Sequence, residues 1–200
     1  MHCLVTAGAT IEPIDAVRRL TNQSTGRLGC GLADALSRAG HRVTLLLSET
    51  ALHSPRSKKV RVLRFDTTKN LTEQMRAAAA LKVKAVFHAA AVSDFFVKQP
   101  LKGKISSAKI LKLELSPTPK IIRQLRKWHP NAFLVGWKFE VEGGRDSAVA
   151  AARAQIKTCK TNASIANGPA YGEGFGVVTD AVFHCADRRV LFRHWVTSLR

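Results

Sequence analysis

Several residues of the first long polar segment have the types and spacing of a phosphate site. Within residues 7–29, Asn22-Gln23-Ser24-Thr25-Gly26 stands directly before a predicted helix. Hydroxyls, backbone donors and a helix N-terminus are the parts from which anion sites are built. The segment lacks the G-x-G-x-x-G pattern of dinucleotide-binding folds, and Ser24 and Thr25 could equally cap the helix. Taken alone, it leaves phosphate binding and helix capping both open.

A second segment, His88-Ala89-Ala90-Ala91-Val92-Ser93-Asp94, leaves a predicted strand through very small side chains. Small residues let a ligand lie directly against the backbone. The carboxylate of Asp94 could then accept a hydrogen bond from a ribose hydroxyl or a base amino group. Aspartate at such a position also commonly caps a helix or a turn, so this second interpretation stays open.

Two later segments add lysines. Lys102-Gly103-Lys104-Ile105-Ser106-Ser107 presents two lysines and two hydroxyls around a glycine, which suits a triphosphate or the charge that develops at an α-phosphate. Stretches of this kind are also often plain solvated loops. Residues 135–140, Val-Gly-Trp-Lys-Phe-Glu, offer Trp137 to a base or ribose and Lys138 to a phosphate, although Trp137 could equally belong to the core.

The elements that would position these segments alternate between short apolar strands and helices. We predict strands at residues 2–7, 42–47, 60–65, 85–89, 133–137 and 163–166, and helices at 29–39, 72–80, 119–128 and 147–159. Residues 110–115 alternate like a half-exposed strand, and the tail from Gly176 to Phe192 has the pattern of short β-strands. The order predicts one α/β domain over residues 1–200. We expect a Rossmann-like, doubly wound, mostly parallel sheet with a short C-terminal β extension and a ligand at the carboxyl ends of its strands.

Composition and charge narrow the classes of protein. No apolar run approaches the roughly 20 residues of a membrane span, and no signal peptide is recognisable, so we expect a cytoplasmic protein without a membrane partner. The four cysteines are too scattered for a zinc or redox motif, which predicts reduced and buried thiols. The net charge of +18 favours polyanions, either nucleic acid or a small ligand with several phosphates.

Together and in this order, the four segments resemble the phosphopantothenoylcysteine synthetases of coenzyme A biosynthesis over roughly residues 4–167. The most specific match is the string from Thr6 to Gly26, TAGATIEPIDAVRRLTNQSTG. The strings HAAAVSDFF, GKISS, TPKIIRQLRKW and VGWKFE are similar to the stand-alone bacterial members. Those members lack a fused flavin-dependent decarboxylase, so we expect no flavin here.

The resemblance implies a two-step ligase that joins 4'-phosphopantothenate to cysteine through an acyl-nucleotidylate, with release of pyrophosphate. Asn22 corresponds to the asparagine that handles the acyl intermediate, Arg18 to an arginine one helical turn earlier, and Lys104 to a lysine that activates the α-phosphate. The positions implied in nucleotide binding are Gly8, Ser24, Thr25, Gly26, Ala89, Ala90, Asp94, Ser116, Pro117, Thr118, Pro119, Trp137 and Lys138. The resemblance further implies CTP, or alternatively ATP, as co-substrate, magnesium held by unidentified residues, and a homodimer.

The chain departs from the family pattern at several positions. Ala9 stands where a second glycine is usual, which matters if that position needs a positive φ. Trp137 replaces a usual phenylalanine. Where a lysine near the triphosphate is expected, the chain has Gln155 or Ala154, and Lys157 or Lys160 could take its place. Asn167 corresponds to the family asparagine after the final core strand, and the sequence beyond it matches poorly.

Two other classes of function fit parts of the sequence. A nicotinamide-dependent oxidoreductase would share the fold, but G-x-G-x-x-G is absent and Tyr171, the only tyrosine, has no lysine four residues later. A basic nucleic-acid-binding module is suggested by charge alone. Because the basic residues are dispersed and no aromatic stacking array accompanies them, we expect only non-specific binding to nucleic acid.

Overall fold

The computed structural model describes residues 1–108 and 110–199. Its central feature is an eight-stranded sheet in the order β12-β11-β10-β9-β6-β1-β4-β5. The parallel strands are β1 (His2–Ala7), β4 (Arg42–Ser48), β5 (Arg61–Phe65), β6 (Ala85–His88), β9 (Phe133–Phe139) and β10 (Ala163–Asn167). Antiparallel β11 (Phe175–Val178) and β12 (Val182–Cys185) extend the sheet beyond β10. The predicted Rossmann-like, mostly parallel sheet is confirmed.

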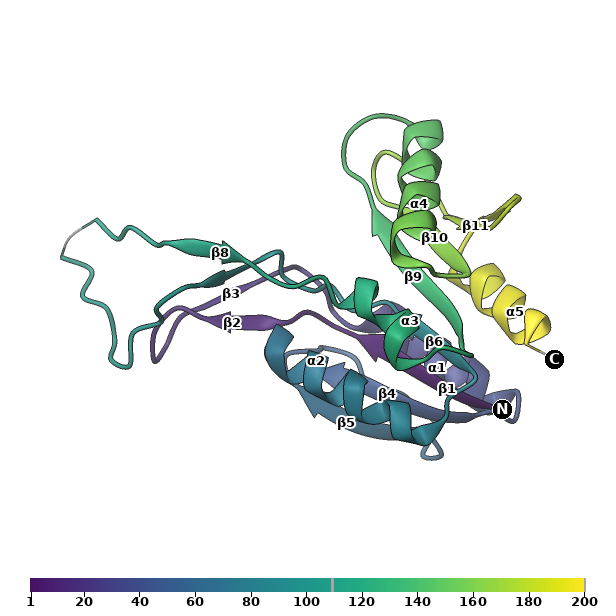
Figure 1. Cartoon of the computed structure of the whole chain (residues 1–200), viewed down its shortest axis with the longest axis horizontal. Coiled ribbons are helices and arrows are strands. Elements are labelled where there is room, and N and C mark those ends of the chain that lie inside the picture. The colour runs from purple at the N-terminus through teal and green to yellow at the C-terminus, as the bar shows by residue number, and fades with distance from the viewer. Residues whose placement is uncertain (109, 200) are drawn as a thin grey trace.

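Helices cover both faces of this sheet (Figure 1). Successive side chains of a strand point to opposite faces, so Val5 and Leu4 on β1 belong to different cores. The face of Val5 packs against α1 (Arg27–Arg38) and α5 (Arg188–Ser198). The face of Leu4 packs against α2 (Thr68–Ala77) and α3 (Leu125–Trp128), and α4 (Arg145–Cys159) lies on the same side over β9 and β10. Burial on both faces explains the continuous apolar runs that predicted these strands.

The helix α5 corrects the prediction that short β-strands continue to Phe192. Residues 175–178 and 182–185 are strands as expected, but a helix begins at Arg188. Asp187 caps it, because its carboxylate accepts hydrogen bonds from the backbone N–H groups of Arg189 and Val190 at 2.7 and 2.9 Å. Leu191 and Trp195, one helical turn apart, are both buried against the sheet. The two cap bonds and this spacing of buried side chains make the segment a helix.

An arm extends from the sheet and is seen at the left of Figure 1. It consists of residues 11–21 and 95–117, apart from residue 109, and contains two antiparallel pairs. These are β2 (Ile11–Pro13) with β3 (Arg19–Thr21), and β7 (Phe95–Val97) with β8 (Leu115–Pro117). The predicted strand at 110–115 is therefore wrong except for its last residue. The alternation of apolar and polar residues there does not correspond to a buried face, because Ile110 is 92% exposed and Leu111 and Leu113 are also exposed.

The remaining helices were found with shifted boundaries. α2 begins at Thr68 rather than Thr72, because the side chain of Thr67 accepts a hydrogen bond from the N–H of Asn70. The helix predicted at 119–128 consists of a 3₁₀ helix, Ile121–Gln124, followed by the single turn of α3. α1 ends before Gly40, which has a φ of +89°, as its predicted role at the helix C-terminus requires.

The four cysteines are free and buried, as predicted. Burial raises the pKa of the Cys3 and Cys30 thiols to about 11, so both stay protonated near neutral pH. None of the helices in the described part of the chain is long and apolar enough to cross a membrane.

Candidate active site

A cleft of about 820 Å³ opens at the carboxyl ends of the central strands. Its lining comes from the ends of β1, β4, β6 and β10 and from the first turns of α1 and α5. The lining residues are Gly8, Thr21, Asn22, Gln23, Ser24, Thr25, Gly26, Arg27, Leu28, Gly29, Thr50, Leu52, Ala89, Asn167, Phe175 and Arg188. Among them are two arginines and no acidic residue, so the cleft favours an anionic ligand.

The N-terminus of α1 opens into this cleft without a side-chain cap. Gly26 is the N-cap residue, with a φ of +76°, and the first turn contains no acidic side chain. The hydroxyl of Thr25 lies 3.4 Å from the N–H of Arg27, a long contact, and Ser24 makes no hydrogen bond among the residues described. The N–H groups of Leu52 and His53 donate to the carbonyl of Thr25 at 3.1 and 3.2 Å and hold the loop in place. This geometry favours the anion site over the capping interpretation.

The tight turn after β1 is set by Gly8. Its φ is +87°, and a Cβ atom there would lie 2.5 Å from the Cβ of Ser48. Ala9 has no positive φ and bridges to Ala91, so alanine in place of the usual family glycine puts no strain on the backbone. The positive φ of this turn occurs at Gly8, the family glycine that the chain retains.

A buried hydroxyl and imidazole position the small-residue loop after β6. The Thr6 hydroxyl accepts a hydrogen bond from the N–H of Ala90 at 3.0 Å and lies 3.0 Å from Nδ1 of His88. Burial lowers the pKa of His88 to about 4, so the ring is neutral and its Nδ1 can accept the Thr6 proton. The N–H of Ala91 also donates to the carbonyl of Gly8 at 2.9 Å. These bonds place Ala89 in the cleft beside Gly8.

Asn22 lies in the cleft, and its Nδ2 donates to the carbonyl of Val92 at 3.3 Å. The bond ties the end of the first segment to the small-residue loop. Arg18 is not one helical turn before it, because residues 19–21 form β3. Arg18 instead lies at the turn of the β2–β3 hairpin, outside the cleft lining.

Arg18 and the Lys104 segment are held together on the arm by the buried carboxylate of Asp15. Asp15 accepts hydrogen bonds from the N–H of Ile105 at 3.0 Å and from the guanidinium of Arg18 at 2.5 Å. These bonds, that of Ile105 above all, hold the pKa of Asp15 well below its usual range. Arg18 also donates to the carbonyl of Ile105 at 3.1 Å. Lys104 is exposed, forms no ion pair within the described residues and does not line the cleft.

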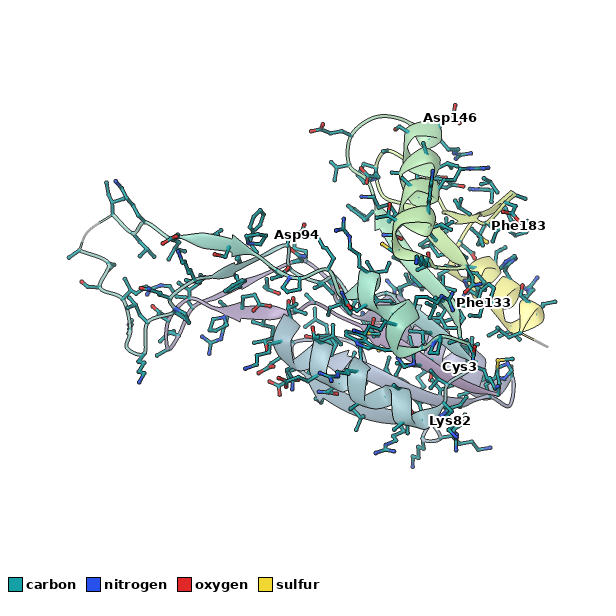
Figure 2. All side chains as sticks on the ribbon, viewed as in Figure 1. Cys3, Lys82, Asp94, Phe133, Asp146 and Phe183 are labelled. Atoms are coloured by element: carbon teal, nitrogen blue, oxygen red, sulfur yellow. The ribbon has the colours of Figure 1, made fainter. Side chains whose placement is uncertain are left out.

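Asp94 and the residues Ser116 to Pro119 form a second group where the arm joins the sheet (Figure 2). Asp94 forms an ion pair with Lys120, and its carbonyl accepts from the N–H of Thr118 at 2.9 Å. The hydroxyl of Thr118 donates to the carbonyl of Ser93. The structure thus brings together two predicted nucleotide segments that are remote in sequence, although neither lines the cleft itself.

The predicted residues on β9 face the interior or a neighbouring charge. Trp137 packs against the core, where its Nε1 is buried without a partner among the described residues. Lys138 pairs with Glu140 at 2.6 Å.

The residues considered for the missing lysine are not placed in the cleft. Gln155 donates to the carbonyl of Trp137 at 3.2 Å and accepts from the hydroxyl of Ser164 at 2.7 Å, so both ends of its amide serve the fold. Lys157 and Lys160 lie where α4 ends, before the start of β10. They are therefore at the opposite edge of the sheet from the cleft.

Sequence reasoning missed residues on two sides of the cleft. Thr50 and Leu52 follow the carboxyl end of β4 and could have been found by the rule that located the other loops. Phe175 and Arg188 come from the C-terminal segment, where the helix was not predicted. Within residues 1–108 and 110–199, no cluster of three or more histidine, cysteine, aspartate or glutamate side chains is arranged to hold a metal ion.

Comparison with known proteins places the fold and the cleft in context. Residues 1–193 match the family described as the DNA/pantothenate metabolism flavoprotein C-terminal domain. The coenzyme A biosynthesis bifunctional protein CoaBC of Thermococcus kodakarensis is 38% identical over 165 residues, which are 82% of this chain and 40% of that protein. The chain thus spans less than half the length of the curated relatives it matches.

Solved structures share the fold, and two of them illustrate it. The DNA/pantothenate metabolism flavoprotein from Streptococcus pneumoniae has a TM-score of 0.90 and 26% identity, with 100% of this chain and 98% of that chain covered. A Cab2 mutant in complex with phosphopantothenate-cysteine has a TM-score of 0.83 at 19% identity, covering 99% of this chain and 85% of that chain, and shows the fold alone.

Proposed function

The chain belongs to the family of the DNA/pantothenate metabolism flavoprotein C-terminal domain, and from this membership we propose that it is a phosphopantothenate–cysteine ligase. The observation that carries the proposal is the cleft. Gly8, Asn22 and Gly26 of the first segment meet Ala89 of the second there, beside a helix N-terminus without a side-chain cap and with no acidic residue among the described lining. A nucleoside triphosphate and a phosphorylated carboxylic acid are ligands of the charge that this lining favours.

In the first half-reaction, the carboxylate of 4'-phosphopantothenate attacks the α-phosphorus of the nucleotide, and pyrophosphate leaves. Two anions must approach one another, so catalysis depends on cations and hydrogen-bond donors that are already in position. The free N–H groups of the first turn of α1 and the side chain of Arg27 supply these along the cleft. We assign Asn22 to the acyl group of the nucleotidylate, which the cysteine amine attacks in the second half-reaction.

We propose CTP as the preferred nucleotide and ATP as the alternative. We also propose that the nucleotide binds together with a magnesium ion. The lining offers hydroxyl and amide oxygens but no carboxylate, so it suits a magnesium ion carried by the triphosphate rather than one held by the protein. Bound in this way, the ion would neutralise phosphate charge. Ser24 and Thr25 are the hydroxyl groups placed to contact the phosphates or their ion.

We also propose that the protein acts as a homodimer. The arm exposes several apolar side chains, namely Val17, Phe95, Leu101, Ile110, Leu111, Leu113 and Leu115. A surface of this kind is suited to burial against a second copy. Such a contact would also give Lys104, which lies outside the cleft lining of its own chain, a route to the cleft of the other subunit.

The test of the ligase is pyrophosphate release by the purified protein with CTP or ATP, 4'-phosphopantothenate and cysteine, omitting one component at a time. Release that requires phosphopantothenate but not cysteine identifies the first half-reaction and its nucleotide. A folded protein that releases no pyrophosphate with either nucleotide would refute the proposed function.

Subunit complementation tests the dimer. In an equimolar mixture of Asn22→Asp and Lys104→Gln subunits, sites completed across a two-fold interface restore about one quarter of the wild-type rate. If both residues serve the same chain, mixing restores nothing.

A further inference from the structure

Three residues form a wall of the cleft that the proposed mechanism leaves without a role. Asn167 ends β10, Phe175 begins β11, and Arg188 begins α5. The strand register brings them to the same edge of the sheet, because Ala166 pairs with Gly176 and Phe175 pairs with Cys185. All three residues come from the C-terminal part of the chain, which completes the cleft.

Asn167 presents a hydrogen-bond acceptor that has no donor. Its Oδ1 is buried, and no partner for it exists among the residues that the structure describes. A buried carbonyl oxygen without a donor is unfavourable unless a ligand or an ordered water supplies one. The cleft beside Asn167 is where such a donor would enter.

Arg188 presents a cation that has no anion. Its side chain is half-buried, and its guanidinium takes part in no hydrogen bond or ion pair within residues 1–108 and 110–199. The neighbouring carboxylate of Asp187 is occupied by the N–H groups of Arg189 and Val190. Arg188 is therefore available to bind a carboxylate or phosphate in the cleft.

A purely anionic ligand would pair with Arg188 but would leave the oxygen of Asn167 without a donor. The two residues together suit a ligand that carries both a donor and an anion. We propose that this wall is the binding site of the α-amino acid: its carboxylate binds Arg188, its amine donates to Oδ1 of Asn167, and its side chain lies against the ring of Phe175. The proposal rests on the proposed ligase function and adds to it the site of the cysteine co-substrate.

The position agrees with the chemistry of the second half-reaction. The lone pair of the amine forms a bond to the acyl carbon near Asn22, and the bond between that carbon and the nucleotide phosphate oxygen breaks. The electron pair stays on the leaving nucleoside monophosphate, and the amine releases its proton to water. A hydrogen bond from the amine to Asn167 would orient the nitrogen toward the acyl carbon in the shared cleft.

The experiment compares cysteine with cysteamine, which keeps the amine and thiol but lacks the carboxylate. With Arg188→Gln, we expect kcat/KM for cysteine to fall by about 10- to 100-fold, the worth of a charge-assisted hydrogen bond, while kcat/KM for cysteamine stays unchanged. Asn167→Ala should lower kcat/KM for both amines. Pyrophosphate release in the absence of cysteine is measured for both variants, because it reports on the first half-reaction alone. Arg189→Gln, an exposed neighbour outside the cleft, is the matched control and should behave as wild type.

Two results would overturn the proposal. One is an equal loss with cysteine and cysteamine in Arg188→Gln; the other is slowed pyrophosphate release with a raised KM for the nucleotide, which would assign Arg188 to the phosphates. If the wild-type protein releases no pyrophosphate, the ligase function fails separately. Calorimetric titration of the wild-type chain with cysteine then decides the amino-acid site, which stands only if Arg188→Gln abolishes the binding.

Discussion

Gly29 is the point at which α1 comes closest to β1, and replacing it by alanine tests how rigidly the cleft is built. A Cβ atom at Gly29 would lie 2.5 Å from the Cβ of Ala7 and 2.9 Å from the carbonyl oxygen of Thr6. Comfortable contacts between carbon atoms begin at about 3.5 Å, so the first turn of α1 would have to move by about 1 Å. Both neighbours belong to a buried central strand, which cannot move in compensation.

The expected cost follows from two opposing effects. Overpacking against a rigid neighbour destabilises a protein by about 1–3 kcal/mol. Alanine in place of glycine inside a helix recovers about 0.5–1 kcal/mol. We therefore expect Gly29→Ala to lower the free energy of unfolding by about 1–2 kcal/mol, which for a chain of this size lowers Tm by roughly 2–8 °C. Displacement of the α1 N-terminus should also lower kcat/KM by about 10- to 100-fold.

Thermal and urea unfolding followed by circular dichroism measure the first effect, and pyrophosphate release measures the second. Gly31→Ala, in the same helix, is the control: its Cβ would meet only the ring of Phe192 at 2.7 Å, a half-buried side chain that can turn toward solvent. We expect its stability to stay within about 1 kcal/mol of wild type. A Gly29→Ala protein as stable and as active as Gly31→Ala would refute the close-packed origin of the cleft.

Three further predictions concern single side chains. Lys104→Gln should slow pyrophosphate release about 100- to 1000-fold in single-turnover assays, and an unchanged rate would make Lys104 a surface lysine. Asn22→Asp should bind the nucleotide normally while the acyl-nucleotidylate accumulates, as seen by chromatography of quenched reactions; normal turnover would remove Asn22 from the mechanism. Because the folded-state pKa of His88 is about 4, the unfolded chain binds a proton that the folded chain does not between pH 6.5 and 4, so stability falls as pH decreases, by about 3 kcal/mol in total. His88→Asn should remove this part of the pH dependence of urea unfolding, and parallel curves for the two proteins would contradict the assignment.

The sheet was predictable because its strands are apolar on both faces and its helices end in recognisable ways. The apolar composition of β1 and β4 was sufficient to predict both strands, and Gly40 indicated where α1 ends. Prediction failed where structure depends on tertiary contacts. Residues 110–115 alternate without a buried face, and α5 depends on Leu191 and Trp195 meeting a sheet that the local sequence does not reveal.

The candidate site was predictable to the extent that it follows strand ends. Asn22, Gly26 and Ala89 fall in the cleft because the carboxyl ends of parallel strands meet at one edge. Asp94 and Lys104 lie in recognisable motifs, but their positions depend on the path of the arm. Hydrogen bonds such as those that Asp15 accepts from Arg18 and Ile105 fix that path. No local signal indicated Arg188, because its place in the cleft follows from the register of two antiparallel strands.

The cleft unites Gly8 with Arg188, and this has a consequence for how the protein is made. During synthesis at about 5–20 residues per second, roughly 10 to 40 s separate the appearance of these two residues. Until then the residues of the α1 side of the cleft have been synthesised without the cation of Arg188. Under the proposed assignments, the residues that bind phosphate are therefore synthesised before the amino-acid site is complete, which is the order in which the two half-reactions use them.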